Sequence, residues 1–242
     1  MANTSWVRKI GLLVFGGVVV AASSFGQKPP IADQIAKTYG LDSYGQIDAI
    51  RYTWSAEFPG GKVSRNWIWE PKADRVSYEG KDKDGKPVKV TYVRSQLSSQ
   101  PAMVKDEIDP SFMNDQYWVL FPFHVVWDSA SDVKDEGMQK LPIGKGTARK
   151  VVVKYPSDGG YTPGDTWTLF VGTDNRVKAF DYHRGGSKKP TEVIAAWTDY
   201  KMAGPILVAQ DHRGTADGKP LRVIFSDVAV KVTGSDNWVE AK

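Results

Sequence analysis

The sequence predicts a mainly β protein, in which an antiparallel sheet of about ten strands bends around an interior and a few short helices accompany it. From Ala49 onward, apolar and polar residues alternate with a period of two in one segment after another. Polar, glycine-rich turns separate these segments and few helical stretches intervene, which favours antiparallel pairing of neighbours. The sequence contains no repeat of roughly 20–50 residues, the mark of a propeller or solenoid.

The N-terminal segment has the pattern of a secretory signal peptide. Arg8 and Lys9 precede an uncharged apolar run from Ile10 to Ala22, which is shorter than the roughly 20 residues of a bilayer-spanning helix. Small residues follow it, and we expect cleavage near Gly26. The alternative is an uncleaved N-terminal anchor.

Removal of residues 1–26 leaves residues 27–242, which we expect to form a single β-rich domain in the periplasm or outside the cell. This length is enough to bury a substantial core. Loss of the two N-terminal basic residues lowers the formal charge from +4 to +2, without the dense basic stripe that nucleic acid requires. The chain has no cysteine, so disulfides and a cysteine-linked lipid anchor are excluded. We therefore expect neither a nucleic-acid partner nor a permanent membrane anchor.

The first elements of the mature chain are a helix and a four-stranded meander. Apolar residues four apart, with proline at the start and glycine at the end, predict an amphipathic helix over Pro30–Gly40. Alternation then predicts strands in 49–58, 63–70, 75–79 and 88–92, joined by glycine-containing turns.

Residues 95–127 interrupt the strand pattern. Asp109 and Pro110 are typical of a helix start, and we expect a helix from Phe112 to Phe121 that Pro122 ends. The stretch 117–127 is the most apolar of the mature chain, which indicates burial. Strand alternation resumes in 147–155, 166–171, 176–182, 193–202, 206–210 and 221–230.

The sequence contains no complete catalytic or metal-binding motif. His124, His183 and His212 have no ligand spacing to one another, and no G-x-S-x-G nucleophile motif occurs. The segment 144–147 matches only part of a phosphate loop, and the segment 82–85 matches only part of a calcium loop. We therefore expect no enzyme activity, no metal and no cofactor.

The positive signal is aromatic. Eight tryptophans lie in the mature chain, and each large ring buries about 150–250 Å². One interpretation is that these rings simply fill a core. The other is that a curved sheet lined by rings that cannot fully interdigitate leaves a concave apolar pocket, as in small-molecule sites. The candidate ligand-binding residues are Tyr52, Trp54, Phe58, Trp67, Trp69, Trp118, Phe121, Trp127 and Trp167.

This layout resembles the lipoprotein-carrier superfamily, the outer-membrane lipoprotein-sorting proteins of Gram-negative bacteria. The resemblance lies in the signal peptide, the short helix, the two meanders, the central passage 115–123, and the segment 165–171 followed by 175–177. It implies an open, unclosed β-barrel with helices as a lid over a cavity for acyl chains. The arginine that gates such a cavity could correspond to Arg51 or Arg65, and no flanking motif decides between them.

The leading hypothesis is therefore an exported protein that binds a lipid-like ligand or the acyl chains of lipoproteins and performs no chemistry on them. A second hypothesis is an interaction module whose apolar 109–127 passage docks on another envelope protein. A third is a secreted hydrolase, which would need His124 or His212 within hydrogen-bond reach of a serine and an acid.

Overall fold

The computed structural model describes residues 28–186 and 191–242, so the predicted signal peptide lies outside the described residues. All thirteen strands of the described part belong to one sheet, with the order β4-β3-β2-β1-β12-β11-β9-β8-β7-β6-β5, while β10 pairs with β11 and β13 with β12. Every pairing is antiparallel. The end strands β4 and β5 do not pair with each other. The predicted open, unclosed antiparallel barrel is confirmed.

The strands have the following bounds: β1 Ile47–Phe58, β2 Gly61–Glu70, β3 Arg75–Lys81, β4 Pro87–Val93, β5 Asp132–Lys140, β6 Thr147–Lys154, β7 Thr166–Val171, β8 Val177–His183, β9 Glu192–Ala196, β10 Thr198–Ala203, β11 Ile206–Ala216, β12 Lys219–Val232 and β13 Trp238–Glu240. The α-helices are α1 Pro30–Thr38, α2 Leu41–Tyr44 and α3 Asp109–Trp127. A single turn of 3₁₀ helix covers Pro71–Ala73, two 3₁₀ turns joined by a kink at Gln96 cover Arg94–Ser99, and one π-helical turn, Val104–Ile108, leads into α3.

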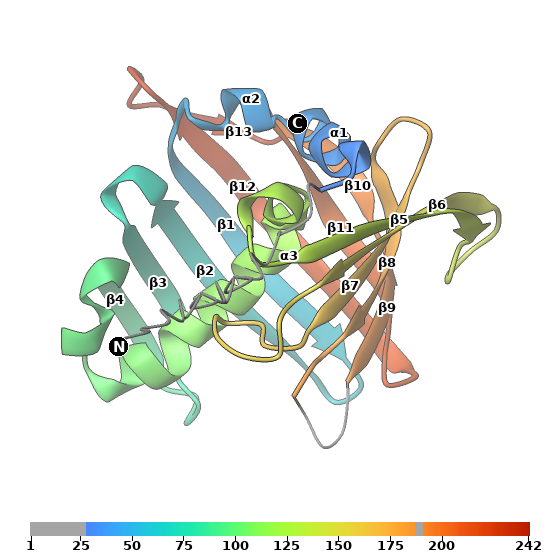
Figure 1. Cartoon of the computed structure of the whole chain (residues 1–242). Helices are drawn as coiled ribbons and strands as arrows, with labels where there is room; N and C mark the ends of the chain where they lie inside the picture. The colour runs from blue at the N-terminus through green and yellow to red at the C-terminus, as the bar shows by residue number, and fades with distance from the viewer. Residues whose placement is uncertain (1–27, 187–190) are drawn as a thin grey trace, which may run out of the picture.

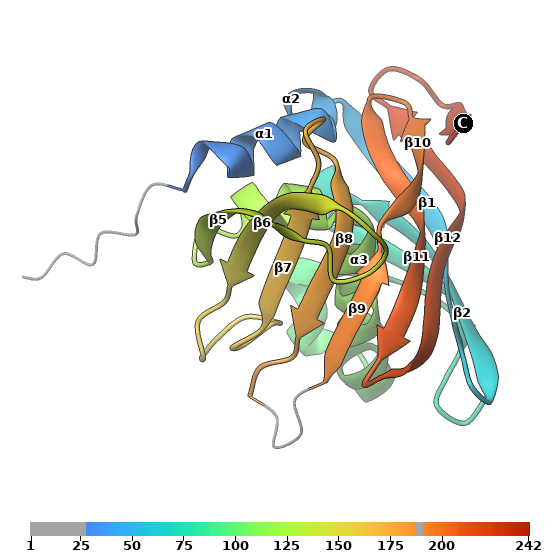
Figure 2. The same ribbon diagram turned by 90° about the vertical axis from the view of Figure 1, so that its right-hand side faces the viewer.

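The sheet curves around α3, which crosses its concave side (Figure 1), and α1 and α2 cover one end of the curve (Figure 2). Alternation positions the large rings on this inner side. Trp67 of β2 packs on Phe112 of α3 with ring centroids 5.5 Å apart, and Trp167 of β7 stacks on Phe121 at 4.1 Å. Helix and sheet thus share one apolar core.

The expectation that Pro122 ends the central helix is wrong. Helix α3 continues through Pro122 to Trp127. Proline has no N–H for the carbonyl four residues earlier, which costs a helical hydrogen bond. Phe123 and Val125, in the turn that follows, are fully buried, and their burial favours continuation of the helix. The predicted N-terminal helix is confirmed as α1.

Three further differences concern strands. Sequence reasoning missed β5, because eight of its nine residues are exposed and only Val133 is buried. It also missed the three-residue β13. The single strand expected over 193–202 is divided at Trp197 into β9 and β10, which pair with different parts of β11.

Candidate functional site

A pocket of ≈750 Å³ opens beside α3, between the helix and β7–β9. Met113 and Trp118 of α3 line it together with Trp167 of β7, whose ring makes an edge contact with Trp118 at a centroid distance of 5.7 Å. The pocket is also lined by Pro110, Asn114, Tyr117, Tyr161, Thr162, Pro163, Asp165, Tyr182, Arg184, Gly185, Gly186, Thr191 and Val193. Rings and aliphatic groups therefore lie next to polar groups from the β6–β7 and β8–β9 loops.

A second groove of ≈1300 Å³ lies on the other side of α3, along β2–β4 and the turn before the helix. Its lining includes charged side chains of both signs, among them Lys62, Glu79, Lys81 and Asp106. Small-molecule sites typically have volumes of roughly 300–1,000 Å³. The pocket beside Trp118 and Trp167 falls in this range, and two of the rings expected to bind a ligand line it. This pocket is therefore the candidate ligand site.

Helix α3 is fastened to β2 by a buried ion pair. The carboxylate of Asp115 is fully buried and accepts two hydrogen bonds of 2.7 Å from Arg65 Nε and Nη2. Trp67 Nε1 donates a third of 2.8 Å. Burial raises the pKa of Asp115, and Arg65 opposes this shift. The Arg65 guanidinium also lies 4.0 Å from the ring centroid of Trp54, a cation–π contact.

A second buried carboxylate, Asp109, fastens the start of α3. Tyr92 OH donates to Asp109 at 2.9 Å, Arg94 Nε at 3.0 Å and Tyr161 OH at 2.9 Å. Tyr161 belongs to the β6–β7 loop, so this loop reaches across the mouth of the pocket to α3. Arg94 also donates to Tyr161 OH at 3.0 Å.

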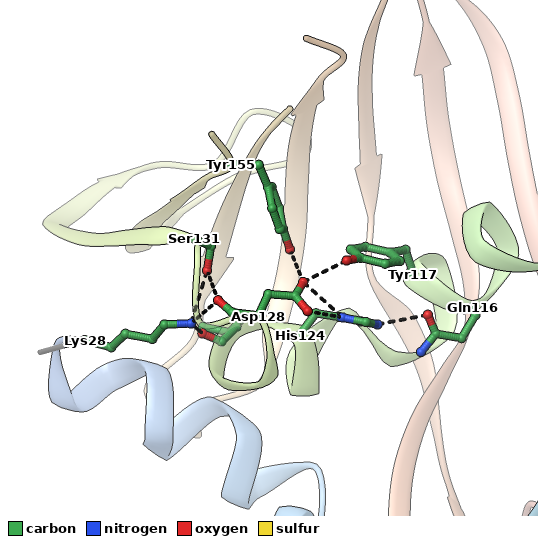
Figure 3. A network of polar contacts seen from close by, with 8 residues as sticks. Lys28, Gln116, Tyr117, His124, Asp128, Ser131 and Tyr155 are labelled. Carbon is green, nitrogen blue, oxygen red and sulfur yellow. Dashed lines mark hydrogen bonds and ion pairs between the residues drawn. The ribbon is translucent and has the colours of Figure 1, made fainter. Parts of the chain in front are cut away.

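A third carboxylate, Asp128, fastens the end of α3 (Figure 3). Tyr117 OH donates to it at 2.8 Å and Tyr155 OH at 2.6 Å, and His124 Nδ1 lies 3.1 Å from both of its oxygens. Burial opposes ionisation, yet the hydrogen bonds from His124 and the tyrosines lower the pKa of Asp128. His124 Nε2 lies 2.9 Å from Gln116 Oε1, so both ring nitrogens have oxygen partners.

The ammonium group of Lys28 completes this end of the helix (Figure 3). It donates to the carbonyls of Val125 at 2.8 Å and Asp128 at 2.7 Å, and to Ser131 Oγ at 3.1 Å. Burial lowers the pKa of Lys28. A cation at the carbonyl end of a helix is favourable, so Lys28 ties the start of the described chain to α3.

The nine candidate residues from the sequence are distributed unevenly around the pocket. Trp118 and Trp167 line it. The other buried ones are Tyr52, Trp54, Trp67 and Phe121. Trp69 and Trp127 are half-buried, with Trp127 stacked on Phe123 at 5.0 Å, and Phe58 is 44% exposed at a strand end.

Sequence reasoning missed the pocket residues that come from loops and from a single helix face. Met113 carries no periodic signal, because α3 is apolar on nearly every side. Tyr161 and Arg184 reach the rim from glycine-containing loops. The course of a loop cannot be predicted from the periodicity of its residues. For Tyr182 and Val193 there was a weak signal, because both lie in segments with strand alternation that were expected to pair near the strand of Trp167.

The histidines do not form the arrangement that the hydrolase hypothesis required. His124 contacts Asp128 and Gln116, with no serine in the set. In the described chain, neither ring nitrogen of His212 has a hydrogen-bond partner.

His183 belongs to a small surface group with Asp181 and Glu192, whose ligand-type atoms lie within 4.8 Å of one another. Its Nε2 lies 3.0 Å from Asp181 Oδ1 and 3.6 Å from Glu192 Oε1.

No protein-family model and no curated protein matches the chain. Solved structures resemble its fold. A DUF1329 family protein from Desulfovibrio piger is 10% identical, with a TM-score of 0.47 over 87% of this chain and 96% of that chain. A putative outer membrane lipoprotein-sorting protein domain from Vibrio parahaemolyticus is 11% identical, with a TM-score of 0.47 over 86% and 93%. A LolA superfamily protein from Nitrosomonas europaea is 8% identical, with a TM-score of 0.44 over 81% and 92%.

One of these structures is named as a lipoprotein-sorting protein domain and another as a LolA superfamily protein. The likeness is confined to the path of the chain, because no more than 11% of the aligned residues are identical. Among the described helices, none is both long and apolar enough to cross a bilayer.

Proposed function

We propose that the protein is exported to the periplasm or beyond and holds an apolar, lipid-like molecule in the pocket between α3 and β7–β9, without chemical change. The observation that supports this most directly is the ≈750 Å³ pocket lined by Trp118 and Trp167. Its volume lies within the range of roughly 300–1,000 Å³ that is typical of ligand sites.

The driving force for such binding is the burial of hydrocarbon. An acyl chain gains about 0.8 kcal/mol for each CH₂ removed from water. Sixteen carbons would supply on the order of 10 kcal/mol before the costs of association are subtracted. This allows stable but reversible holding, which suits a carrier of lipids or of lipoprotein acyl chains.

Native mass spectrometry of protein purified from its host without detergent tests the proposal. The expected result is a bound lipid of defined mass. Binding of the neutral dye Nile red, followed by fluorescence titration, gives a second measurement on lipid-free protein. An empty protein that also fails to bind Nile red would contradict the proposal and leave the docking hypothesis in its place.

A pair of matched variants locates the site. Met113 lines the pocket, whereas Met138 is 57% exposed on β5. The Met113→Trp variant places a large ring at the pocket wall, and we expect it to weaken Nile red binding by at least about tenfold, because the ring occupies space the ligand needs. The Met138→Trp variant should bind as the parent protein does. Equal binding by both variants would place the ligand elsewhere.

A further inference from the structure

Several polar atoms of the described core are buried without hydrogen-bond partners, and three side chains that carry such atoms cluster at the pocket wall and next to it. Trp167 Nε1, Trp197 Nε1 and both ring nitrogens of His212 have no partner there. The three side chains are at most 2% exposed. Buried polar groups in native proteins are nearly always paired, and an unpaired one is costly. These three residues, here called the interior polar cluster, therefore require an explanation.

The members of the interior polar cluster surround one ring, Phe180 of β8. The Phe180 centroid lies 5.4 Å from Trp167, 5.6 Å from Trp197 and 6.2 Å from His212. The rings of Trp197 and His212 are themselves 4.3 Å apart. The donors thus come from β7, from β11 and from the break between β9 and β10, and occupy one region of the concave wall.

The interior polar cluster is continuous with the candidate site. Trp167 is both a member of the cluster and a wall of the pocket. Trp118 of α3 lies next to both regions, with its ring centroid 5.7 Å from that of Trp167 and 6.3 Å from that of His212. The unpaired nitrogens are themselves buried, so a ligand in the pocket reaches them only after the surrounding rings, Trp118 among them, shift. Such a shift is part of the binding step proposed below.

The chemistry of the cluster selects for an uncharged ligand. An indole nitrogen only donates hydrogen bonds. Burial lowers the pKa of His212 to about 4, and the nearby Ala196 carbonyl opposes this shift without forming a well-aligned hydrogen bond. His212 is therefore neutral at neutral pH. Arg184 is the arginine in the pocket lining, outside the interior polar cluster, so no cation lies within the cluster to balance a buried anion.

We propose that the ligand is an uncharged apolar molecule with a carbonyl oxygen within its chain, such as a long-chain ester, and that this oxygen accepts hydrogen bonds from the interior polar cluster. The inference rests on the proposed function, because it specifies the occupant of the same pocket. A pure hydrocarbon would leave the donors unpaired, and a free fatty acid would have to bury its carboxylate or keep it near Arg184 at the rim.

Displacement of Nile red by three probes of similar chain length tests the inference: hexadecane, methyl palmitate and palmitic acid. We expect methyl palmitate to bind about tenfold more tightly than hexadecane, because one or two net hydrogen bonds supply a factor of this size. The His212→Phe variant should lose most of this preference while binding hexadecane as before. The Trp238→Phe variant, altered on β13 away from the pocket, should retain the preference.

The outcomes separate the two proposals. If Nile red binds but methyl palmitate and hexadecane displace it equally well, the inference is overturned and the proposed function stands. The same holds if palmitic acid binds most tightly and the His212→Phe substitution has no effect. Failure of every probe to bind would overturn both.

Thermal unfolding provides an independent measurement. If His212 serves a ligand, the Phe variant should be as stable as the parent or more so, whereas a marked loss of stability would assign His212 a structural role.

Discussion

Asp115 is a fully buried carboxylate whose charge is balanced by Arg65. Removal of one partner from a buried ion pair leaves the other uncompensated, at a cost of about 3–5 kcal/mol. Since Arg65 is 20% exposed, we expect Asp115→Asn to lower the free energy of unfolding by about 2–4 kcal/mol, measured by urea denaturation. The Glu79→Gln variant, which removes an exposed pair with Lys89, should change it by less than about 1 kcal/mol. Equal effects would mean that Asp115 is not a true anchor of α3.

His212 should make stability depend on pH in a defined window. Its pKa is about 4 in the folded protein, against 6.5 when unfolded, so the unfolded chain binds more protons between these values. The free energy of unfolding is therefore not lowered by His212 above pH 6.5, where the ring is neutral in both states. It falls by about 3 kcal/mol in total as the pH drops towards 4.

Urea denaturation of the parent and the His212→Phe variant at several pH values between 4 and 7.5 measures this loss. We expect the variant to lose about 3 kcal/mol less than the parent over that range. His183→Gln, at a surface histidine, is the control and should leave the His212-dependent loss in place. Parallel pH curves for the parent and His212→Phe would contradict the buried, neutral state.

The C-terminal end of α3 depends on a residue almost a hundred positions away in the sequence. Lys28 donates to two carbonyls there. We expect Lys28→Met to lower the free energy of unfolding by about 1–2 kcal/mol, because these hydrogen bonds and the charge at the helix end are both lost. Lys37→Met removes an exposed pair with Asp33 on α1 and should cost less than about 0.5 kcal/mol. Similar losses in both variants, measured in urea, would exclude a specific cap.

The elements that the sequence predicted best are those whose two faces differ most. Alternation in β1 and β2 predicted which side of each strand is buried, because one side packs on α3 and the other meets solvent. The same signal fails for α3, because this helix is surrounded by the sheet and α1. Its apolar residues therefore do not gather on one face, and no periodicity in the sequence showed that the helix continues past Pro122. It fails for β5 for the opposite reason, since a strand with one buried residue has too little apolar surface to alternate.

The candidate site was predictable only in part for a related reason. Trp118 and Trp167 were identified because tryptophans are easily recognised in the sequence and their large rings are usually buried. Asp109, Asp115 and Asp128 were not, because their burial depends on partners from distant segments: Arg65 is 50 residues from Asp115, and Tyr161 is 52 residues from Asp109. Spacing along the chain carries no signal for such contacts.

At the scale of the whole molecule, α3 bridges the two halves of the curved sheet. Its N-terminal half is fastened to the β2–β4 side through Arg65, Tyr92 and Arg94, and its C-terminal end to the β6 side through Tyr155. The candidate pocket is lined by residues from the N-terminal half of α3 and from β7–β9. On that side, the hydroxyl of Tyr161 links the β6–β7 loop to Asp109. Loss of this hydroxyl removes a polar contact between the loop and the start of α3.

We expect the Tyr161→Phe variant to release this loop without unfolding the protein. Tyr161 is 51% exposed, so loss of its hydroxyl should cost no more than about 1 kcal/mol in the free energy of unfolding. Hydrogen exchange should become faster in residues 156–165 and in the first turns of α3, and unchanged in the central strands β1 and β12. If the pocket holds Nile red, stopped-flow association and dissociation should both be severalfold faster with the Kd nearly unchanged, because a gate alters the two rates together.

The Tyr200→Phe variant removes a hydroxyl that donates to the Val177 carbonyl, away from the pocket, and should leave exchange around α3 unaltered. Unchanged exchange in Tyr161→Phe would show that the loop is held by other contacts and that the ligand enters from another side.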